Sequence, residues 1–535
     1  MPMGKGVRKQ NFLGGVAVLT TAVVVVKIIS ALYKIPLNNI LDGEGVGHFT
    51  IAYNVYGFLL QLSLAGFPLA LSKLTSEQLA LGHYNQVRRQ FRVAAGLFFC
   101  LGASASAIMF FGAAPIAAAL NDSLAYYSIK VLAPAVFFVC LIGCCRGYTQ
   151  GLGDMVPTAV SQILEASFKL VIGLALAWYM LYRLGARVEI GAAAAIFGVS
   201  VGAAAAMLFC ILFLARHRLE NRSADTPERA RTILKRLLVI GVPITLGSSV
   251  MSIITIIDQT VVMARLQDAL GLTEKVAATL YGQYTFGMTL FNLPGTFVYP
   301  VTISMIPAVS AALTRRNGRY AHRIVSASFR LVTMLALPAG VGMSILAGPI
   351  LQLLYPAVPE TAAAATYHLQ LLGVASVFIC LMLLCNAVLQ AYGRVYIPIV
   401  TAAIGGTLKI ISNYTLCGDP DFGIRGAPIS TLLCYAVIAL LDLTAVAVVL
   451  GRERPRYLRL LLKPALATAV MALAARGSFD ALYGAGFSEK GAVLLAVLLA
   501  VAVYGALALL LRMVTREDLS LLPRGEKIAK ILHIR

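Results

Sequence analysis

Long apolar stretches separated by short polar ones run along almost the whole chain. A helix of about 20 apolar residues crosses the hydrocarbon core of a bilayer, and fourteen stretches approach or exceed that length. Because only helices and closed barrels satisfy their backbone groups in lipid, the pattern predicts an all-α polytopic membrane protein with fourteen transmembrane helices. The predicted spans are approximately 12–33, 46–72, 91–119, 126–146, 157–183, 192–214, 237–263, 279–304, 324–347, 366–389, 395–416, 427–450, 460–483 and 491–513.

One segment recurs 240 residues later without a gap. The stretch from Tyr127 to Lys169 aligns with the stretch from Tyr367 to Lys409, and both copies are mostly apolar. Six predicted spans separate the copies, an even number, so the two halves share one orientation in the membrane. The duplication therefore predicts two parallel six-helix repeats, and internal repeats of this kind are typical of membrane transporters.

The repeat also predicts how the chain is divided into domains. An N-terminal six-helix half would be followed by a polar linker, a C-terminal six-helix half, an extra helix pair and a basic tail. The predicted boundaries are 1–214, 215–236, 237–450, 451–513 and 514–535.

Basic residues gather in alternate connections. Lys and Arg concentrate at both ends of the chain and in the loops near 73–92, 215–236, 315–323 and 452–463, whereas the intervening loops are short and nearly neutral. Fourteen spans place all of these basic segments on one side. By the positive-inside rule, we expect both termini to be cytoplasmic and the protein to lie in a bacterial plasma membrane.

The composition excludes several functional classes. Apolar residues make up 59% of the chain and charged residues 13%, against roughly 25% charged in soluble domains. The net charge of +21 is explained by the basic loops, so we expect no nucleic-acid partner. The nine cysteines and six histidines show no metal-ligand spacing, and no P-loop or catalytic constellation is present. We therefore expect neither an enzyme nor a cofactor.

Several short runs carry a resemblance to a known family. The sequence resembles the polysaccharide-export branch of the MOP superfamily, in particular the group of stage V sporulation protein B, which is related to MurJ-type lipid II flippases. The runs are Lys34–Leu37 (KIPL), Gly43–Gly47 (GEGVG), Ala52–Tyr56 (AYNVY), Ala65–Leu74 (AGFPLALSKL) and Arg146–Gly151 (RGYTQG).

The resemblance implies a MOP/MATE-like fold and a flippase function. Such proteins move an undecaprenyl-diphosphate-linked saccharide from the inner to the outer leaflet by alternating access. The substrate implied most directly is the peptidoglycan precursor lipid II, and the expected partners are this lipid-linked saccharide, membrane lipids and cell-wall synthesis enzymes in growth or sporulation. The extra helix pair 451–513 would form a groove for the lipid tail. MurJ-type relatives place cavity arginines on spans one, two and eight, whereas spans two and eight contain no Arg or Lys here.

Charged groups at membrane depth are costly and usually mark a transport pathway. Lys169 and its repeat partner Lys409 lie near the middle of predicted spans five and eleven. Two such ammonium groups would suit a diphosphate, because lysine binds phosphate as a point charge. Glu165 lies one helical turn before Lys169, so an ion pair between these two residues is an alternative.

Other polar residues within the spans complete the candidate site. Lys27 in span one and Asn54 in span two are candidates for substrate contact, although snorkelling and helix–helix contact explain them as well. The remaining candidates would bind a coupling Na⁺ or H⁺. They are Asp258 in span seven, Asp442 in span twelve, and Asn386 with Gln390 in span ten.

Two other functions are compatible with parts of the pattern. A multidrug/cation antiporter of the same superfamily would use an anionic cavity, which Asp258, Glu165 and Asp442 favour and the central lysines oppose. A membrane glycosyltransferase or polymerase would need catalytic carboxylates in sizeable outer loops. The predicted outer loops are short, which argues against that class.

Overall fold

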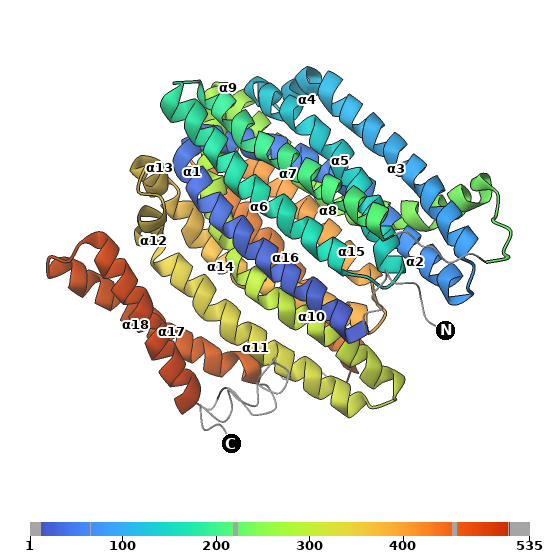
Figure 1. The fold of residues 1–535 in the computed structure, drawn as a ribbon. Helices are drawn as coiled ribbons and strands as arrows, with labels where there is room; N and C mark the ends of the chain where they lie inside the picture. Colours follow the sequence, from blue (N-terminus) through green and yellow to red (C-terminus); the bar gives the residue numbers. More distant parts are fainter. Residues whose placement is uncertain (1–11, 65, 218–222, 452–456, 512, 514–535) are drawn as a thin grey trace. The chain divides into compact units, whose positions relative to one another are not determined.

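The computed structural model describes residues 12–64, 66–217, 223–451, 457–511 and 513. The described residues form helices and contain no strand (Figure 1). The predicted basic tail 514–535, the N-terminal residues 1–11 and part of the predicted linker lie outside this range.

The chain forms two compact units, Met1–Gly282 and Gln283–Arg535. These units are defined by compactness, and the division into sequence repeats stays a prediction. The first unit contains α1 (Phe12–Leu64), α2 (Phe67–Ala80), α3 (Tyr84–Phe111), α4 (Ala113–Ala119), η1 (Ser123–Ala125), α5 (Tyr126–Gly151), α6 (Val156–Trp178), η2 (Tyr179–Arg183), α7 (Val188–Arg216), α8 (Ala230–Asp268) and the start of α9 (Glu274–Phe291).

The second unit is also helical throughout its described residues. It contains the end of α9, then α10 (Leu293–Thr314), α11 (Gly318–Ile345), α12 (Ala347–Leu354), α13 (Pro359–Ala364), α14 (Thr366–Ala391), α15 (Tyr396–Leu416), η3 (Gly423–Arg425), α16 (Gly426–Leu450), α17 (Tyr457–Gly484) and α18 (Glu489–Leu510).

Eleven helical segments of the described chain are long and apolar enough to cross a membrane. The first of them, Thr21–Ala80, contains the second predicted span and overlaps most of the first. Predicted spans 237–263 and 395–416 are not among the eleven, but they coincide with α8 and α15, which are helices of 39 and 21 residues. The prediction of an all-α polytopic membrane protein is confirmed.

The predicted boundaries at the start of the chain are wrong. The expected loop between spans one and two, at 34–45, is mostly helical, because α1 continues through Pro36 and deviates only at Asp42, whose φ is 56°. The second predicted span, 46–72, is instead divided between α1 and α2, and α2 begins beside Pro68, which suits the first turn of a helix. Hydropathy does not record such breaks, because both sides of each break are apolar.

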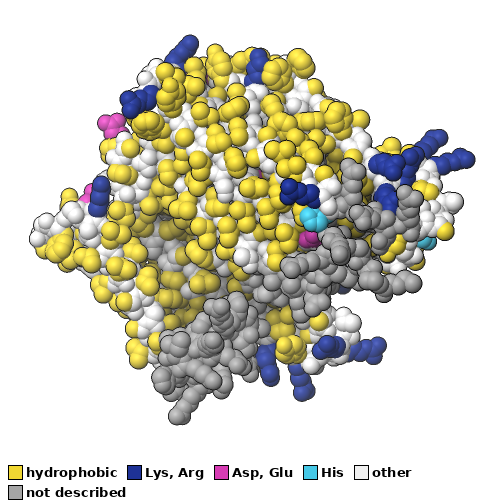
Figure 2. All heavy atoms as spheres, viewed as in Figure 1, with side chains coloured by type: hydrophobic (Ala, Val, Ile, Leu, Met, Phe, Trp, Pro, Cys, Tyr) yellow, Lys and Arg dark blue, Asp and Glu magenta, His cyan; other side chains and the backbone are white. Residues whose placement is uncertain are grey.

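The surface has the character expected of a protein in lipid. Figure 2 shows hydrophobic side chains over most of the visible face, with Lys and Arg in a few groups, mostly towards its margins. Large apolar side chains such as Phe111, Val448 and Leu510 are 83, 80 and 78% exposed. In water such a surface would aggregate, whereas in a bilayer it faces acyl chains.

Close packing in the first unit depends on glycines where α6 meets α7. A Cβ atom on Gly198 would lie 2.5 Å from the Cα and N atoms of Gly173, closer than real atoms approach. Gly173 itself has the carbonyl oxygen of Ala195 at 2.7 Å from its would-be Cβ. Small residues allow helix backbones to approach in this way within membranes.

We expect Gly198→Ala to destabilise the first unit by about 1–3 kcal/mol, because the backbones of α6 and α7 must separate. Gly96→Ala is the matched control, since a Cβ on Gly96 in α3 meets nothing within 4 Å. The control should be neutral or slightly stabilising, because alanine favours a helix over glycine. Thermal unfolding in one detergent compares the two variants, and equal melting temperatures would contradict this account.

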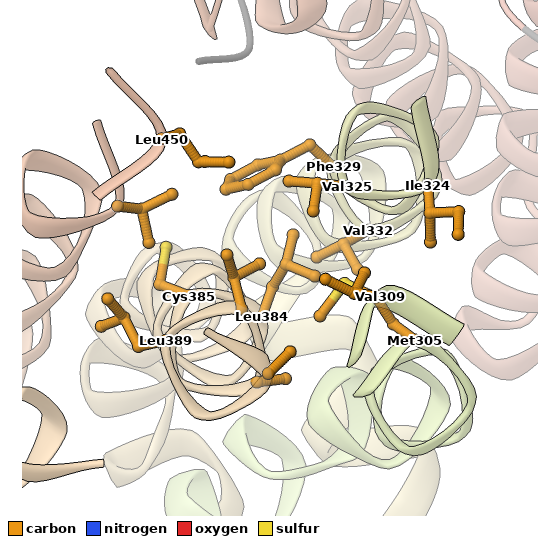
Figure 3. Packing of buried hydrophobic residues seen from close by; sticks show 14 of the residues in the cluster. Met305, Val309, Ile324, Val325, Phe329, Val332, Leu384, Cys385, Leu389 and Leu450 are labelled. Carbon is orange, nitrogen blue, oxygen red and sulfur yellow. The ribbon is translucent and has the colours of Figure 1, made fainter. Parts of the chain in front are cut away.

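The second unit has a core of interdigitated aliphatic side chains. Figure 3 shows Met305 and Val309 from α10, Val325 and Phe329 from α11, and Leu384 from α14 converging in one cluster. These residues are at most 2% exposed. The helices of this unit are therefore held by ordinary side-chain packing, as in soluble cores.

Asp225 ties the connection before α8 to the start of α3. Its carboxylate accepts hydrogen bonds from the backbone N–H groups of Asn85 (3.2 Å) and Gln86 (2.8 Å) and from the hydroxyl of Ser223. Slight burial acts to raise the pKa of Asp225, but these hydrogen bonds stabilise the ionised form and leave the pKa below its usual 3.8.

We expect this attachment to weaken in acid. Because folding lowers the pKa of Asp225, its ionised carboxylate stabilises the attachment above the usual value of 3.8, and this contribution is lost as the pH falls through the lowered pKa. Asp225→Asn should therefore speed hydrogen exchange at the amides of Asn85 and Gln86 at neutral pH. Asp421→Asn, in an exposed loop, is the control. Unchanged protection in D225N would refute the attachment.

Candidate functional site

Lys169 lies on α6 among aromatic side chains from α1. Its Nζ donates a hydrogen bond to Tyr53 Oη at 3.2 Å and lies 4.4 and 4.7 Å from the ring centroids of Tyr53 and Tyr33. The faces of these rings attract a cation and offset part of the cost of holding an ammonium group within a span. Within the described chain Tyr53 is the only hydrogen-bond acceptor for Lys169, so two of its three N–H donors remain for a ligand.

The position of these aromatic rings follows from helix geometry. Phe49, Tyr53 and Tyr56 are spaced at i, i+4 and i+7 on α1, so they share one helix face. Phe49 stacks on Tyr53 with centroids 5.7 Å apart, and Tyr53 lies 5.6 Å from Tyr56. The hydroxyl of Tyr33 donates to the carbonyl oxygen of Ala195 on α7 at 3.4 Å. The rings beside Lys169 are therefore fixed before any ligand arrives.

Arg146 on α5 connects to α6 through two side chains. Its Nε donates to Ser161 Oγ at 2.9 Å, and its Nη2 lies 3.2 Å from Glu165 Oε2. Glu165 therefore pairs with Arg146, and the sequence-based alternative of a Glu165–Lys169 pair is not what the structure shows. The planar guanidinium of Arg146 on α5 contacts two acceptors on the neighbouring helix α6. The ammonium group of Lys169 contacts the tyrosines of α1 instead of Glu165.

Arg146 and Lys34 are closer to the middle of their helices than the sequence predicts. The predicted spans 12–33 and 126–146 leave both residues at span ends, but α5 continues to Gly151 and α1 continues past Lys34 to Leu64. Lys34 is near enough to Lys169 for the two ammonium groups to repel each other. In the described residues, neither ammonium group has a carboxylate within 4.0 Å.

We call Lys34, Arg146, Glu165 and Lys169 the cationic cluster. Three cations and one carboxylate give it a net charge of +2 (3 minus 1). All four residues lie in helical segments that are candidates for crossing the membrane. A positive group of this kind can bind an anion such as a phosphate, with lysine acting as a point charge and arginine supplying a planar fork of donors.

Asn54 connects α1 to α8. Its Nδ2 donates to Gln259 Oε1 at 2.5 Å, and Gln259 is fully buried. The neighbouring candidate Asp258 is 7% exposed on α8. The hydrogen bond gives Asn54 a role in helix–helix contact, and its proposed contact with substrate stays a prediction.

The other sequence candidates differ in their exposure. Lys27 is exposed on α1, Lys409 is half-buried on α15, and Gln390 is exposed on α14. Lys169 and Lys409 belong to different compact units. The predicted role of these three side chains in transport stays a prediction.

Asp442 is the candidate carboxylate that belongs to the second unit. It is 0% exposed on α16, and its Oδ1 accepts a hydrogen bond from Thr401 Oγ1 on α15 at 2.6 Å. Within the described chain, its Oδ2 and the Oδ1 atom of Asn386 have no hydrogen-bond partner. The described residues contain no group of three or more His, Cys, Asp or Glu side chains that would hold a metal ion.

Sequence reasoning missed Tyr33, Tyr53 and Gln259, and it set Lys34 and Arg146 aside. The run Ala52–Tyr56 contains Tyr53, and its spacing from Phe49 signals an aromatic helix face. No local signal pairs Lys169 with Tyr33, because those residues are 136 positions apart (169 minus 33).

Two family models match the chain. The model described as polysaccharide biosynthesis protein matches residues 12–313, and the MatE model matches residues 243–415. The first match covers more than half of the 535 residues.

Three relatives come from Bacillus subtilis (strain 168). The uncharacterized membrane protein YabM is 27% identical over 99% of this chain and 98% of its own length. Stage V sporulation protein B is 23% identical over 96% of this chain and 98% of its own length. The lipid II flippase MurJ is 22% identical over 76% of this chain and 77% of its own length.

Solved structures share the fold. A lipid II flippase MurJ in an inward closed conformation superimposes with a TM-score of 0.69 at 15% identity and covers 92% of this chain and 98% of its own. A multidrug resistance MATE family transporter of the MOP superfamily superimposes with a TM-score of 0.60 at 16% identity, over 83% of this chain and 98% of its own. These two solved proteins are named as a flippase and a transporter, and the fold is that of multi-span membrane transporters.

Proposed function

Since the chain belongs to the polysaccharide biosynthesis protein family of the MOP superfamily, we propose that it is a flippase for an undecaprenyl-diphosphate-linked saccharide. It would move this lipid from the inner to the outer leaflet of the bacterial plasma membrane by alternating access. The substrate proposed is the peptidoglycan precursor lipid II, a name that one relative at 22% identity carries. Both termini would be cytoplasmic, as the basic loops predict.

The observation that carries this proposal is the net positive charge of the cationic cluster. A diphosphate is anionic, and Lys169 keeps two N–H donors for it. Glu165 forms an ion pair with Arg146 and so compensates its charge. The charges of Lys34 and Lys169 are not compensated by any described carboxylate. Charges inside spans are expensive, so an uncancelled pair of ammonium groups favours an anionic substrate.

The extra helix pair would accommodate the lipid tail. α17 and α18 pack on each other through Phe479, Ala492 and Ala496. Their other faces expose large apolar residues, including Leu473 at 76% and Leu498 at 65%. The tail stays among acyl chains throughout, so these faces would guide it by packing contacts rather than add hydrophobic affinity.

Release to the outside is aided by the membrane potential. An inside-negative potential favours outward movement of an anion by about 2.3 kcal/mol per charge per 100 mV. Return of the empty protein would use a coupling cation, and Asp442 is the candidate to carry a proton, because its Oδ2 has no partner in the described chain. Asp258, Asn386 and Gln390 are the other candidates for binding Na⁺ or H⁺.

The alternative function is a multidrug/cation antiporter. The MatE model match at residues 243–415 favours it, and so do the buried carboxylates Asp258 and Asp442. Such a transporter binds cationic compounds, so the cationic cluster of the first unit opposes this reading.

Ligand binding to the purified protein separates the two functions. Native mass spectrometry would be run with lipid II, with undecaprenyl diphosphate, and with a cationic dye such as ethidium. The flippase proposal expects retention of both diphosphate lipids and none of the dye. Retention of ethidium alone by folded protein would instead establish the antiporter reading.

A further inference from the structure

A recess lies outside the cationic cluster, at the start of α3. It has a volume of about 500 Å³ and is formed by α3 and the end of the connection to α8. Four of its seven lining residues are arginines, and they come from two separate elements. The lining consists of Asn85, Arg88, Arg89, Arg92, Pro227, Glu228 and Arg229.

The side chains that line this recess are mostly cationic. The lining carries a net charge of +3, from four arginines and one glutamate. Glu228 is already paired, since its Oε1 lies 3.0 Å from Arg236 Nη1. In the described chain, Arg89, Arg92 and Arg229 have no carboxylate within 4.0 Å. Cations that line one recess favour the binding of an anion there.

The recess is built on a fixed connection. The backbone N–H of Asn85 donates to both Ser223 Oγ (3.3 Å) and Asp225 Oδ1 (3.2 Å), and the backbone N–H of Glu228 donates to Gln86 Oε1 at 2.7 Å. These contacts hold Pro227 and Arg229 beside α3. Asp225 also occupies the N–H groups at the start of α3, so an anion in the recess must be held by the guanidinium groups rather than by the helix terminus.

The position of the recess indicates the chemistry of its ligand. Arg89 and Arg92 lie in the first turns of the candidate span Tyr84–Phe111, so insertion of α3 in a bilayer would bring them near the phosphates of lipid head groups. Guanidinium groups match phosphate through paired, charge-assisted hydrogen bonds. The positive-inside rule explains why basic residues gather on the cytoplasmic side of the membrane. It does not require these residues to surround a recess.

We propose that this recess is a second binding site, for a phosphate-bearing anion held by Arg89, Arg92 and Arg229. The anion is a lipid head group or a soluble phosphate compound, and both present the same chemistry. The site is independent of the transported saccharide, because its residues lie outside the cationic cluster.

The test uses the full-length protein in detergent. Native mass spectrometry measures retention of phosphatidylglycerol, and a titration measures its displacement by inorganic pyrophosphate. The variants are R89Q/R92Q on α3 and R229Q at the start of α8. R315Q/R319Q is the matched control, because it removes two exposed arginines from another predicted cytoplasmic loop. R89K/R92K keeps the charge and removes the planar fork.

We expect R89Q/R92Q and R229Q each to lower phosphatidylglycerol retention by about tenfold, and R89K/R92K to lower it less, with R315Q/R319Q unchanged. Displacement by pyrophosphate would identify soluble phosphate compounds as ligands, and failure of displacement would identify the lipid head group. Retention of both probes by R89Q/R92Q and R229Q at the native level would overturn the proposal. So would an equal loss in R315Q/R319Q, which would reflect general surface charge.

Discussion

Replacing Lys169 with methionine is expected to lower the affinity for undecaprenyl-diphosphate saccharide by about 10- to 100-fold. A hydrogen bond to a charged group contributes about 1.5–3 kcal/mol, and each 1.4 kcal/mol is a factor of about ten in affinity. Methionine keeps the length and the apolar contacts of the lysine stem with Tyr33 and Tyr53 while it removes the charge and both available N–H donors. A titration followed by native mass spectrometry, or by the fluorescence of a labelled lipid, gives the dissociation constant.

Lys130→Met is the matched control for this experiment. Lys130 on α5 has a similar environment, since its Nζ donates to Tyr126 Oη at 2.7 Å and lies 5.1 Å from the ring centroids of Phe110 and Tyr126. It is outside the cationic cluster, so K130M should bind the saccharide lipid as the native protein does. Equal affinities of K169M and the native protein would remove the cluster from the substrate site.

Replacing Arg146 with methionine should destabilise the first unit by about 3–5 kcal/mol. The change leaves Glu165 without the cation that it pairs with at 3.2 Å, and it also removes the donor to Ser161. A charge whose partner is deleted in a low-dielectric setting is far costlier than the intact pair. Thermal or denaturant unfolding in a single detergent measures the loss.

Removing Glu165 as well should restore much of the stability. In R146M/E165M neither member of the Arg146–Glu165 pair is left without its partner, so the double variant should unfold close to the native protein. The two variants together separate stability from binding, because the double variant still contains Lys34 and Lys169 and should retain the saccharide lipid. If R146M alone is as stable as the native protein, the Arg146–Glu165 pair has no structural role.

The all-helical class and the approximate position of the apolar helices followed from hydropathy, since lipid exposure requires a long apolar segment for each crossing. The boundaries at the start of the chain did not follow. Residues 34–45 contain polar groups and Pro36, which predict a loop, yet α1 continues to Leu64 with a single deviation at Asp42. Tertiary contacts of the first unit override that local signal, and a single sequence does not record them.

The candidate site was predicted in part. Mid-span charge identified Lys169 and Glu165 correctly as ionisable residues within helices, because such residues are rare in apolar spans. Their partners were not predicted. Glu165 reaches Arg146 across a helix interface, and Lys169 reaches Tyr53, which precedes it by 116 residues. Which side chains meet across two helices depends on how each helix is rotated about its own axis. The periodicity of the sequence shows only which broad face of a helix is buried, so it does not fix these pairs.

The central claim is that this chain transfers a diphosphate-linked saccharide between leaflets, and a flipping assay in proteoliposomes tests it most directly. Fluorescent lipid II would be incorporated together with native protein, K169M or K130M, and an impermeant reagent would report the head groups that reach the outer leaflet. The account predicts fast exposure with native protein and K130M, and slow exposure with K169M and with protein-free vesicles. Exposure by native protein at the protein-free rate, in vesicles where the same protein transports ethidium, would contradict it.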